Sequence, residues 1–231
     1  MQSTDLGKTG TMTQRANQRF ENREQAGTSL GLALATRLEA GEYVVLGLLR
    51  GGVPIAAEVA RALGAELGAL AVRKLGVPSN PELAYGAMAS YRGFSGRYLN
   101  EGIHRRAKEG FGSAQLDRVE AETEQALAEL AEMFQEYSPD LAGRIMVICD
   151  DGLATGATVK AAVELVQQLE PERIIIAAPV APPEVLNELS QVADEAVALL
   201  KPGGFTAVGA YYEQFQPVER DQVLALLHSK A

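Results

Sequence analysis

The sequence predicts an α/β fold built on a doubly wound parallel sheet, with a small inserted α+β subdomain. Three apolar runs of strand length, at residues 43–49, 144–149 and 173–180, are each followed by a segment whose apolar residues have helical spacing. Strands that alternate with helices favour a parallel sheet covered by helices on both faces. The 231 residues of the chain are enough for one hydrophobic core of this kind.

The N-terminal part of the predicted domain begins with a helix and a strand. Apolar residues at helical spacing predict a helix from Phe20 to Ala40, and the strand Tyr43–Leu49 follows. This strand runs into Arg50-Gly51-Gly52-Val53-Pro54, a turn that leads to a second helix at Ile55–Leu63. Proline suits the first turn of a helix, and the paired glycines permit backbone conformations that a Cβ atom disfavours.

The middle of the chain departs from this alternation. Residues 72–86 are rich in glycine and proline, and we interpret them as a loop. Residues 87–139 are then expected to form an inserted hood subdomain, with a hairpin at 89–99 and a long helix from Ser113 to Tyr137. The hood would cover a neighbouring site or form the contact of a homo-oligomer. A basic run at His104–Lys108 fits either a solvated face or an additional phosphate contact.

The most informative segment is Asp150–Thr158, which follows the strand at 144–149 and precedes a helix at 159–166. Two adjacent carboxylates, Asp150 and Asp151, therefore lie at the carboxyl end of a strand, where they can accept hydrogen bonds from a vicinal diol. A loop of small and hydroxyl residues then leads to a helix N-terminus. Backbone N–H groups at such a terminus bind phosphate, and the helix dipole favours the anion. The arrangement suits a sugar phosphate.

The C-terminal part returns to the alternation of strands and helices. The expected strand, helix, strand and terminal helix lie at residues 173–180, 182–192, 195–200 and 220–228. Residues 1–14, which are rich in glycine and threonine, are expected to be a flexible tail outside a folded domain at 15–231.

Composition and charge limit the classes of partner. The formal net charge of −9 argues against a surface that binds nucleic acid over the whole molecule. No apolar segment is long enough to span a membrane, and the charged-then-apolar pattern of a signal peptide is missing, so a cytoplasmic location without membrane partners is expected. The single cysteine, Cys149, lies in a predicted strand, and one cysteine cannot form an intrachain disulfide.

The segment Asp150–Thr158 resembles the loop that binds 5-phosphoribosyl 1-diphosphate (PRPP) in the type I phosphoribosyltransferases. The resemblance implies that Asp150 and Asp151 bind the ribose hydroxyls and that Ala154–Thr158 hold the 5′-phosphate. It also implies the sheet topology of that family. Along most of its length the chain is similar to a branch of uncharacterised, predicted bacterial phosphoribosyltransferases.

Two further segments extend the resemblance. Arg50-Gly51-Gly52 is similar to the family's loop for the pyrophosphate group of PRPP. Arg73 and Lys74 resemble a cationic pair that leads into a mobile loop in adenine-type members, although Leu75 stands where those members have proline. A lid at Leu75–Tyr85 that orders over PRPP is therefore expected. The residues implied to bind PRPP are Arg50, Gly51, Gly52, Arg73, Lys74, Asp150, Asp151, Gly152, Leu153, Ala154, Thr155, Gly156, Ala157 and Thr158.

The implied reaction is a Mg²⁺-dependent transfer of the phosphoribosyl group from PRPP to a small nitrogenous acceptor, expected to be a nucleobase, with release of pyrophosphate. The catalytic roles fall to Asp150, Asp151, Lys74 and Arg50. The implied metal contacts are Asp150, Asp151 and Glu213, and the implied acceptor contacts are Phe205 and Tyr85. Ala154 stands where the 6-oxopurine members carry an Asp, so hypoxanthine and guanine are expected to be poor acceptors.

Two other classes of function remain open at this stage. One is a regulator that binds PRPP and keeps the fold without transferase activity, for which a broad basic face would be expected. The other is a different enzyme with the same phosphate loop, such as a phosphoribosyl hydrolase or a diphosphokinase. A diphosphokinase requires an ATP site, and the sequence offers no convincing one.

Overall fold

The computed structural model describes residues 19–229, so the tail expected at residues 1–14 lies outside the described part of the chain. The helices are α1 (Arg23–Ala35), α2 (Gly52–Leu63), α3 (Glu101–Phe111), α4 (Ser113–Met133), α5 (Ala157–Gln167), α6 (Pro183–Leu189) and α7 (Arg220–His228), with short 3₁₀ turns η1 (Gln135–Tyr137) and η2 (Val208–Tyr211). The strands are β1 (Tyr43–Leu48), β2 (Glu66–Val77), β3 (Asn80–Tyr91), β4 (Phe94–Leu99), β5 (Ile145–Cys149), β6 (Arg173–Val180) and β7 (Glu195–Leu200).

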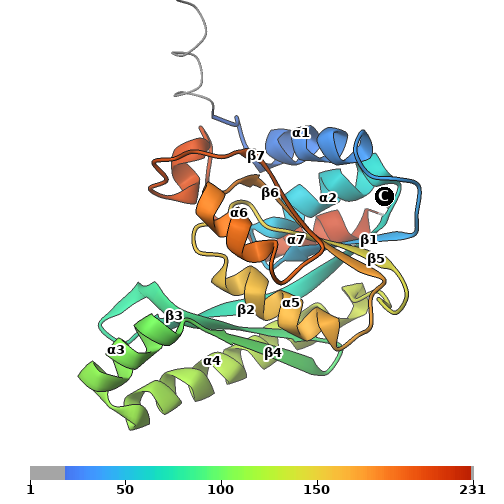
Figure 1. Cartoon of the computed structure of the whole chain (residues 1–231). Coiled ribbons are helices and arrows are strands. Elements are labelled where there is room, and N and C mark those ends of the chain that lie inside the picture. The colour runs from blue at the N-terminus through green and yellow to red at the C-terminus, as the bar shows by residue number, and fades with distance from the viewer. Residues whose placement is uncertain (1–18, 230–231) are drawn as a thin grey trace, which may run out of the picture.

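The strands form one seven-stranded sheet in the order β4-β3-β2-β1-β5-β6-β7. Pairing is parallel from β2 through β1, β5 and β6 to β7, whereas β3 and β4 add an antiparallel edge beyond β2. The chain order reverses direction across the sheet beside β1. The predicted doubly wound parallel sheet is therefore confirmed, since helices follow the parallel strands on both faces (Figure 1).

Two hydrophobic layers enclose the parallel strands. On one face, α1 and α2 cover β1, β5 and β6 through a cluster that includes Leu30, Ile55 and Val147. On the other face, α5 and α6 pack on the same strands through a cluster that includes Ile148 and Val163. Because β1 is buried on both faces, its sequence is apolar at every position and shows no alternation. None of the described helices has the length and apolar character needed to cross a membrane.

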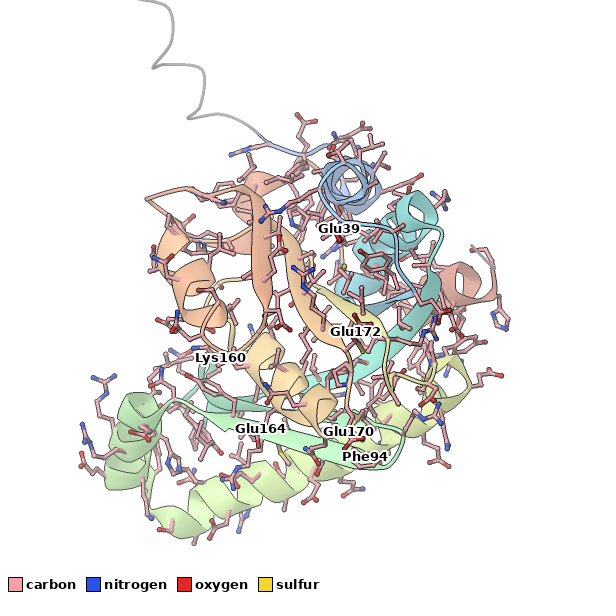
Figure 2. The ribbon with its side chains drawn as sticks, turned by 45° about the vertical axis from the view of Figure 1, so that its right-hand side comes forward. Glu39, Phe94, Lys160, Glu164, Glu170 and Glu172 are labelled. Carbon is pink, nitrogen blue, oxygen red and sulfur yellow. The ribbon has the colours of Figure 1, made fainter. Side chains whose placement is uncertain are left out.

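Residues 87–139 do not form a separate inserted subdomain. The predicted boundary at residue 87 falls in the middle of β3, and β3 and β4 continue the main sheet. Helix α5 packs across both strands, where Gly96 lets the backbone of the helix approach. Lys160 on α5, labelled in Figure 2, adds a hydrogen bond to Tyr98 and a 2.6 Å ion pair to Glu188 of α6. The predicted hairpin at 89–99 and the long helix are confirmed as β3–β4 and α4.

The expected loop at 72–86, with its lid at 75–85, is instead a β-hairpin made by β2 and β3. Pro78 and Ser79 form its turn, and the register shifts on both sides of Gly76. Glycine and proline therefore mark a bulge and a tight turn within paired strands. Leu75 and Tyr85 are fully buried in a cluster with residues of α3 and α4. The predicted loop is therefore a pair of strands, because these apolar residues pack beneath the two helices, and the mobility of residues 75–85 and its response to PRPP stay a prediction.

Candidate active site

A cavity of about 720 Å³ opens at the carboxyl ends of β1 and β5. Open α/β sheets bind ligands at this edge, beside the point where the strand order reverses. The cavity is lined by the β1–α2 turn, by part of β2, by the β5–α5 loop and by Arg23 at the start of α1. Residues 206–218, here called the C-terminal wall, close it from the side after β7.

The cavity brings together most of the residues predicted to bind PRPP. Those that line it are Arg50, Gly51, Arg73, Lys74, Asp150, Asp151, Gly152, Leu153, Ala154, Thr155, Gly156 and Thr158. Gly52 and Ala157 are the first residues of α2 and α5 and adjoin the lining. Three segments distant in sequence thus converge on one edge of the sheet.

The β5–α5 loop presents the N-terminus of a helix to the cavity. Leu153 anchors the loop, because its side chain is buried and its N–H donates to the carbonyl of Val180 at 2.9 Å. Gly156 precedes the helix with a left-handed φ of 68°, which favours glycine, and no side chain caps the first turn. Ala154 and Thr155 are exposed in the cavity. Uncapped N–H groups at such a turn can bind an anion, so this turn is a candidate site for a phosphate.

The β1–α2 turn lies against the β5–α5 loop so closely that only glycine fits. A Cβ atom on Gly51 would collide with the carboxylate of Asp151, and a Cβ atom on Gly52 would collide with the carbonyl oxygen of Cys149. The peptide bond between Leu49 and Arg50 is cis. The paired glycines thus allow the close contact between two loops that line the cavity.

Gly52→Ala is expected to lower the free energy of unfolding by about 1–3 kcal/mol, because the added methyl group meets a backbone carbonyl that cannot move aside. Gly110→Ala is the matched control, since nothing lies within 4 Å of the new methyl group there. Gly110 lies in α3, so alanine should raise stability by roughly 0.5–1 kcal/mol. Urea denaturation of both variants measures the difference. Equal stability of the two would contradict the tight contact.

The two adjacent carboxylates have different environments. Oδ2 of Asp151 accepts a hydrogen bond from Nε of Arg23 at 2.8 Å, and Nη2 of Arg23 lies 2.8 Å from the same oxygen in an ion pair. Asp150 accepts the backbone N–H of Asp151 at 2.9 Å and makes no ion pair among the described residues. Burial and the charge of Asp151 raise the pKa of Asp150 well above its ordinary value. Burial also raises the pKa of Asp151, and the charge and hydrogen bonds of Arg23 oppose that rise. Asp150 is therefore the less compensated of the two charges.

The cavity carries more positive than negative charge. Four cationic side chains and two carboxylates line it, so it suits a ligand with several negative charges. Arg73 and Lys74 leave opposite faces of β2, as successive strand residues do. Lys74 lines the same cavity as the two carboxylates, and its charge opposes the rise in their pKa values. Arg50 is half-exposed and lies 3.9 Å from Glu219.

Three predicted site residues lie elsewhere. Tyr85 is fully buried between β3 and α4, and its hydroxyl donates to the carbonyl of Leu116, so it is not an acceptor contact. Burial raises the pKa of Tyr85 to about 12. Phe205 does not line the cavity and stacks on Tyr211, 5.4 Å between ring centroids. Glu213 is exposed and also outside the lining, so it does not join the two carboxylates as a metal contact.

Arg23 and Phe215 are among the cavity residues that the sequence analysis missed. Arg23 lies 128 residues before its partner Asp151, and no local pattern connects them. Phe215 lies beneath the guanidinium of Arg23, which is 3.9 Å from the ring centroid. The single available signal was Asn22, whose side chain caps α1 and so places Arg23 at its first position.

Comparison with known proteins agrees with this geometry. The model of the family described as "Phosphoribosyl transferase domain" matches residues 31–199. The protein of Mycobacterium tuberculosis H37Rv named "Putative phosphoribosyl transferase Rv0571c" is 42% identical over 211 residues, which cover 90% of this chain and 46% of the relative. The crystal structure of TT1426 from Thermus thermophilus is 42% identical, with a TM-score of 0.72, and the match covers 92% of this chain and 99% of that one.

The chain thus spans about half the length of the curated relative, whereas it spans nearly all of the solved structure. The family match includes β1, β5 and the loops that follow them, which carry the acidic pair and the paired glycines. Sequence, topology and site therefore lead to the same assignment: this chain belongs to the phosphoribosyl transferase domain family.

Proposed function

We propose that the protein transfers the phosphoribosyl group of PRPP to a small nitrogenous acceptor and releases pyrophosphate. One observation carries the proposal. The acidic pair at the end of β5, the open N-terminus of α5 and four cationic side chains all line one cavity. The acidic pair can bind a diol, the N-terminus of α5 a monophosphate and the cationic side chains a diphosphate, and PRPP contains all three groups.

Each loop has a role in the proposed reaction. The bond between the anomeric carbon and the diphosphate breaks, and a bond from that carbon to the acceptor nitrogen forms. Asp150 and Asp151 hold the ribose hydroxyls and stabilise the positive charge that develops on the sugar. Arg50, Lys74 and the amides of the paired glycines stabilise the departing diphosphate. Positioning and electrostatic stabilisation supply most of the rate.

The carboxylates also suit a magnesium ion, although they do not form a complete protein site. Among residues 19–229 no group of three or more His, Cys, Asp or Glu side chains could hold a metal. Magnesium commonly takes one or two carboxylates and completes its shell with water and substrate phosphates, and this donor set fits that pattern. Asp150 and Asp151 would hold it beside PRPP. When bound, the ion neutralises charge on the diphosphate.

The proposal is tested by incubating the protein with PRPP and Mg²⁺ in the presence of adenine, uracil, orotate, hypoxanthine or guanine. Pyrophosphate release that depends on one of these acceptors, together with the matching nucleotide, would support the transferase. PRPP binding by calorimetry without release in any mixture would favour the PRPP-binding regulator. Release that needs no acceptor would indicate a hydrolase. A protein that does not bind PRPP at all would refute the proposal.

A further inference from the structure

Arg23, the first residue of α1, joins the carboxylate of Asp151 to the C-terminal wall. Two of its nitrogens bind Oδ2 of Asp151, and the third, Nη1, donates to the carbonyl of Gln216 at 2.8 Å. Its guanidinium also lies over the ring of Phe215. The side chain is only 12% exposed, so its three nitrogens and one face are engaged within the protein.

Backbone pairing fixes the start of α1 against the C-terminal wall. The N–H of Phe20 donates to the carbonyl of Tyr211 at 2.8 Å, and the N–H of Glu213 returns a bond to Phe20 at 2.8 Å. Gln214 donates to the carbonyl of Glu21 at 2.9 Å. Three backbone hydrogen bonds therefore hold the segment before Arg23 against the wall, and the side chain of Arg23 extends from there to the carboxylate.

A second residue closes a ring of contacts between the wall and Asp151. The hydroxyl of Tyr212 donates to the backbone carbonyl of Asp151 at 2.6 Å. The rings of Tyr212 and Phe215 stack with centroids 4.9 Å apart. Asp151, Arg23, Phe215 and Tyr212 are thus connected in a closed series, so Asp151 contacts the wall from two sides.

We propose that Arg23 is a positioning residue that transmits the binding of PRPP at Asp151 to the C-terminal wall. The inference rests on the proposed function, because it takes PRPP as the ligand of Asp151. Arg23 occupies Oδ2, so the ribose hydroxyls bind Oδ1. The carboxylate then turns toward the ligand and draws the guanidinium with it, together with Gln216 and Phe215. The wall then closes on the cavity. The binding of PRPP at Asp151 is thereby coupled to the binding of the acceptor beside the wall.

Three variants separate the positive charge of Arg23 from its link between Asp151 and the wall. Arg23→Gln removes both the charge and the link. Arg23→Lys keeps a cation beside Asp151, but a single ammonium cannot bind Asp151 and Gln216 together or lie flat over Phe215. Arg37→Gln is the matched control, because Arg37 lies just beyond α1 and makes a 2.6 Å ion pair with Glu195 on β7, away from the cavity.

The wild type and the three variants are compared by hydrogen–deuterium exchange of residues 206–218, with and without PRPP and Mg²⁺, and by calorimetric titration with PRPP. PRPP should slow exchange of the wall in the wild type and in Arg37→Gln. This PRPP-dependent protection should be lost in Arg23→Gln and in Arg23→Lys. PRPP affinity should fall roughly tenfold in Arg23→Gln, and less in Arg23→Lys because the charge is kept.

The measurements distinguish failure of the link from failure of the proposed function. Wall protection that is the same in Arg23→Lys and Arg37→Gln would overturn the link, as would PRPP binding to the wild type without any protection of the wall. A wild type that binds no PRPP would overturn the proposed function itself. If Arg23→Gln does not fold, Arg23→Lys alone decides, because it preserves the charge balance around Asp151.

Discussion

Asp150→Asn is expected to make the protein more stable and, at the same time, to weaken PRPP binding by at least roughly 100-fold. The carboxylate of Asp150 is partly buried, makes no ion pair among the described residues and lies next to a second negative charge. An amide removes that repulsion and retains the oxygen that accepts the N–H of Asp151. We expect a gain of about 1 kcal/mol in the free energy of unfolding at neutral pH.

Asp151→Asn should instead lower both stability and PRPP affinity. Its carboxylate compensates Arg23, whose side chain is 12% exposed, so the amide leaves a largely buried cation without its partner. A loss of roughly 1–3 kcal/mol in the free energy of unfolding is expected. The two neighbouring substitutions are isosteric, which makes each the control for the other.

The pH dependence of stability in metal-free buffer provides a further check. The pKa of Asp150 is raised in the folded protein, so the wild type is stabilised below the ordinary Asp range and loses that contribution as pH rises through the folded pKa. The gain in the free energy of unfolding of Asp150→Asn over the wild type should therefore grow as pH rises from the ordinary pKa of Asp through the raised pKa of Asp150. In acid below that range the gain should vanish. Thermal unfolding of both variants across pH, with calorimetry for PRPP, measures each quantity. Unchanged PRPP affinity in both variants would show that Asp150 and Asp151 do not bind PRPP.

The second large effect concerns the choice of acceptor. By resemblance, 6-oxopurine enzymes use an Asp at the position of Ala154 to exchange a proton with the base. Ala154 is exposed in the cavity and cannot exchange a proton. Proton transfer by a placed side chain contributes roughly 10²–10⁴-fold to a rate. We therefore expect kcat/KM for hypoxanthine and guanine to lie at least about 100-fold below that of the best acceptor.

Steady-state kinetics with the five bases tests this expectation. Ala154→Asp should raise kcat/KM for the 6-oxopurines, whereas Ala154→Ser, which adds a small polar group without an acid, should leave it unchanged. Efficient turnover of hypoxanthine or guanine by the unmodified protein would contradict the role assigned to this position.

Much of the fold could be predicted because its signals are local. The apolar run Tyr43–Leu48, buried on both faces, could only be an interior strand, and the bounds of β6, β7 and α7 agree with the predicted ones. The edge of the sheet was harder. Gly76 marks a bulge in β2 and Pro78 lies in the turn before β3, so two paired strands had the composition of a loop. The predicted subdomain boundary then fell inside β3, which pairs with β2 and packs against α5.

The sequence by itself determined the α/β class and pointed to the candidate phosphate loop, because strand, acidic pair, small residues and helix follow one another within a few positions. Only the tertiary structure decided how the two carboxylates differ. Arg23 reaches Asp151 across 128 residues, since the start of α1 pairs with the C-terminal wall, and Tyr85 is drawn away from the cavity into the core beneath α4. Both outcomes depend on packing between distant segments, which leaves no periodic signal in the chain.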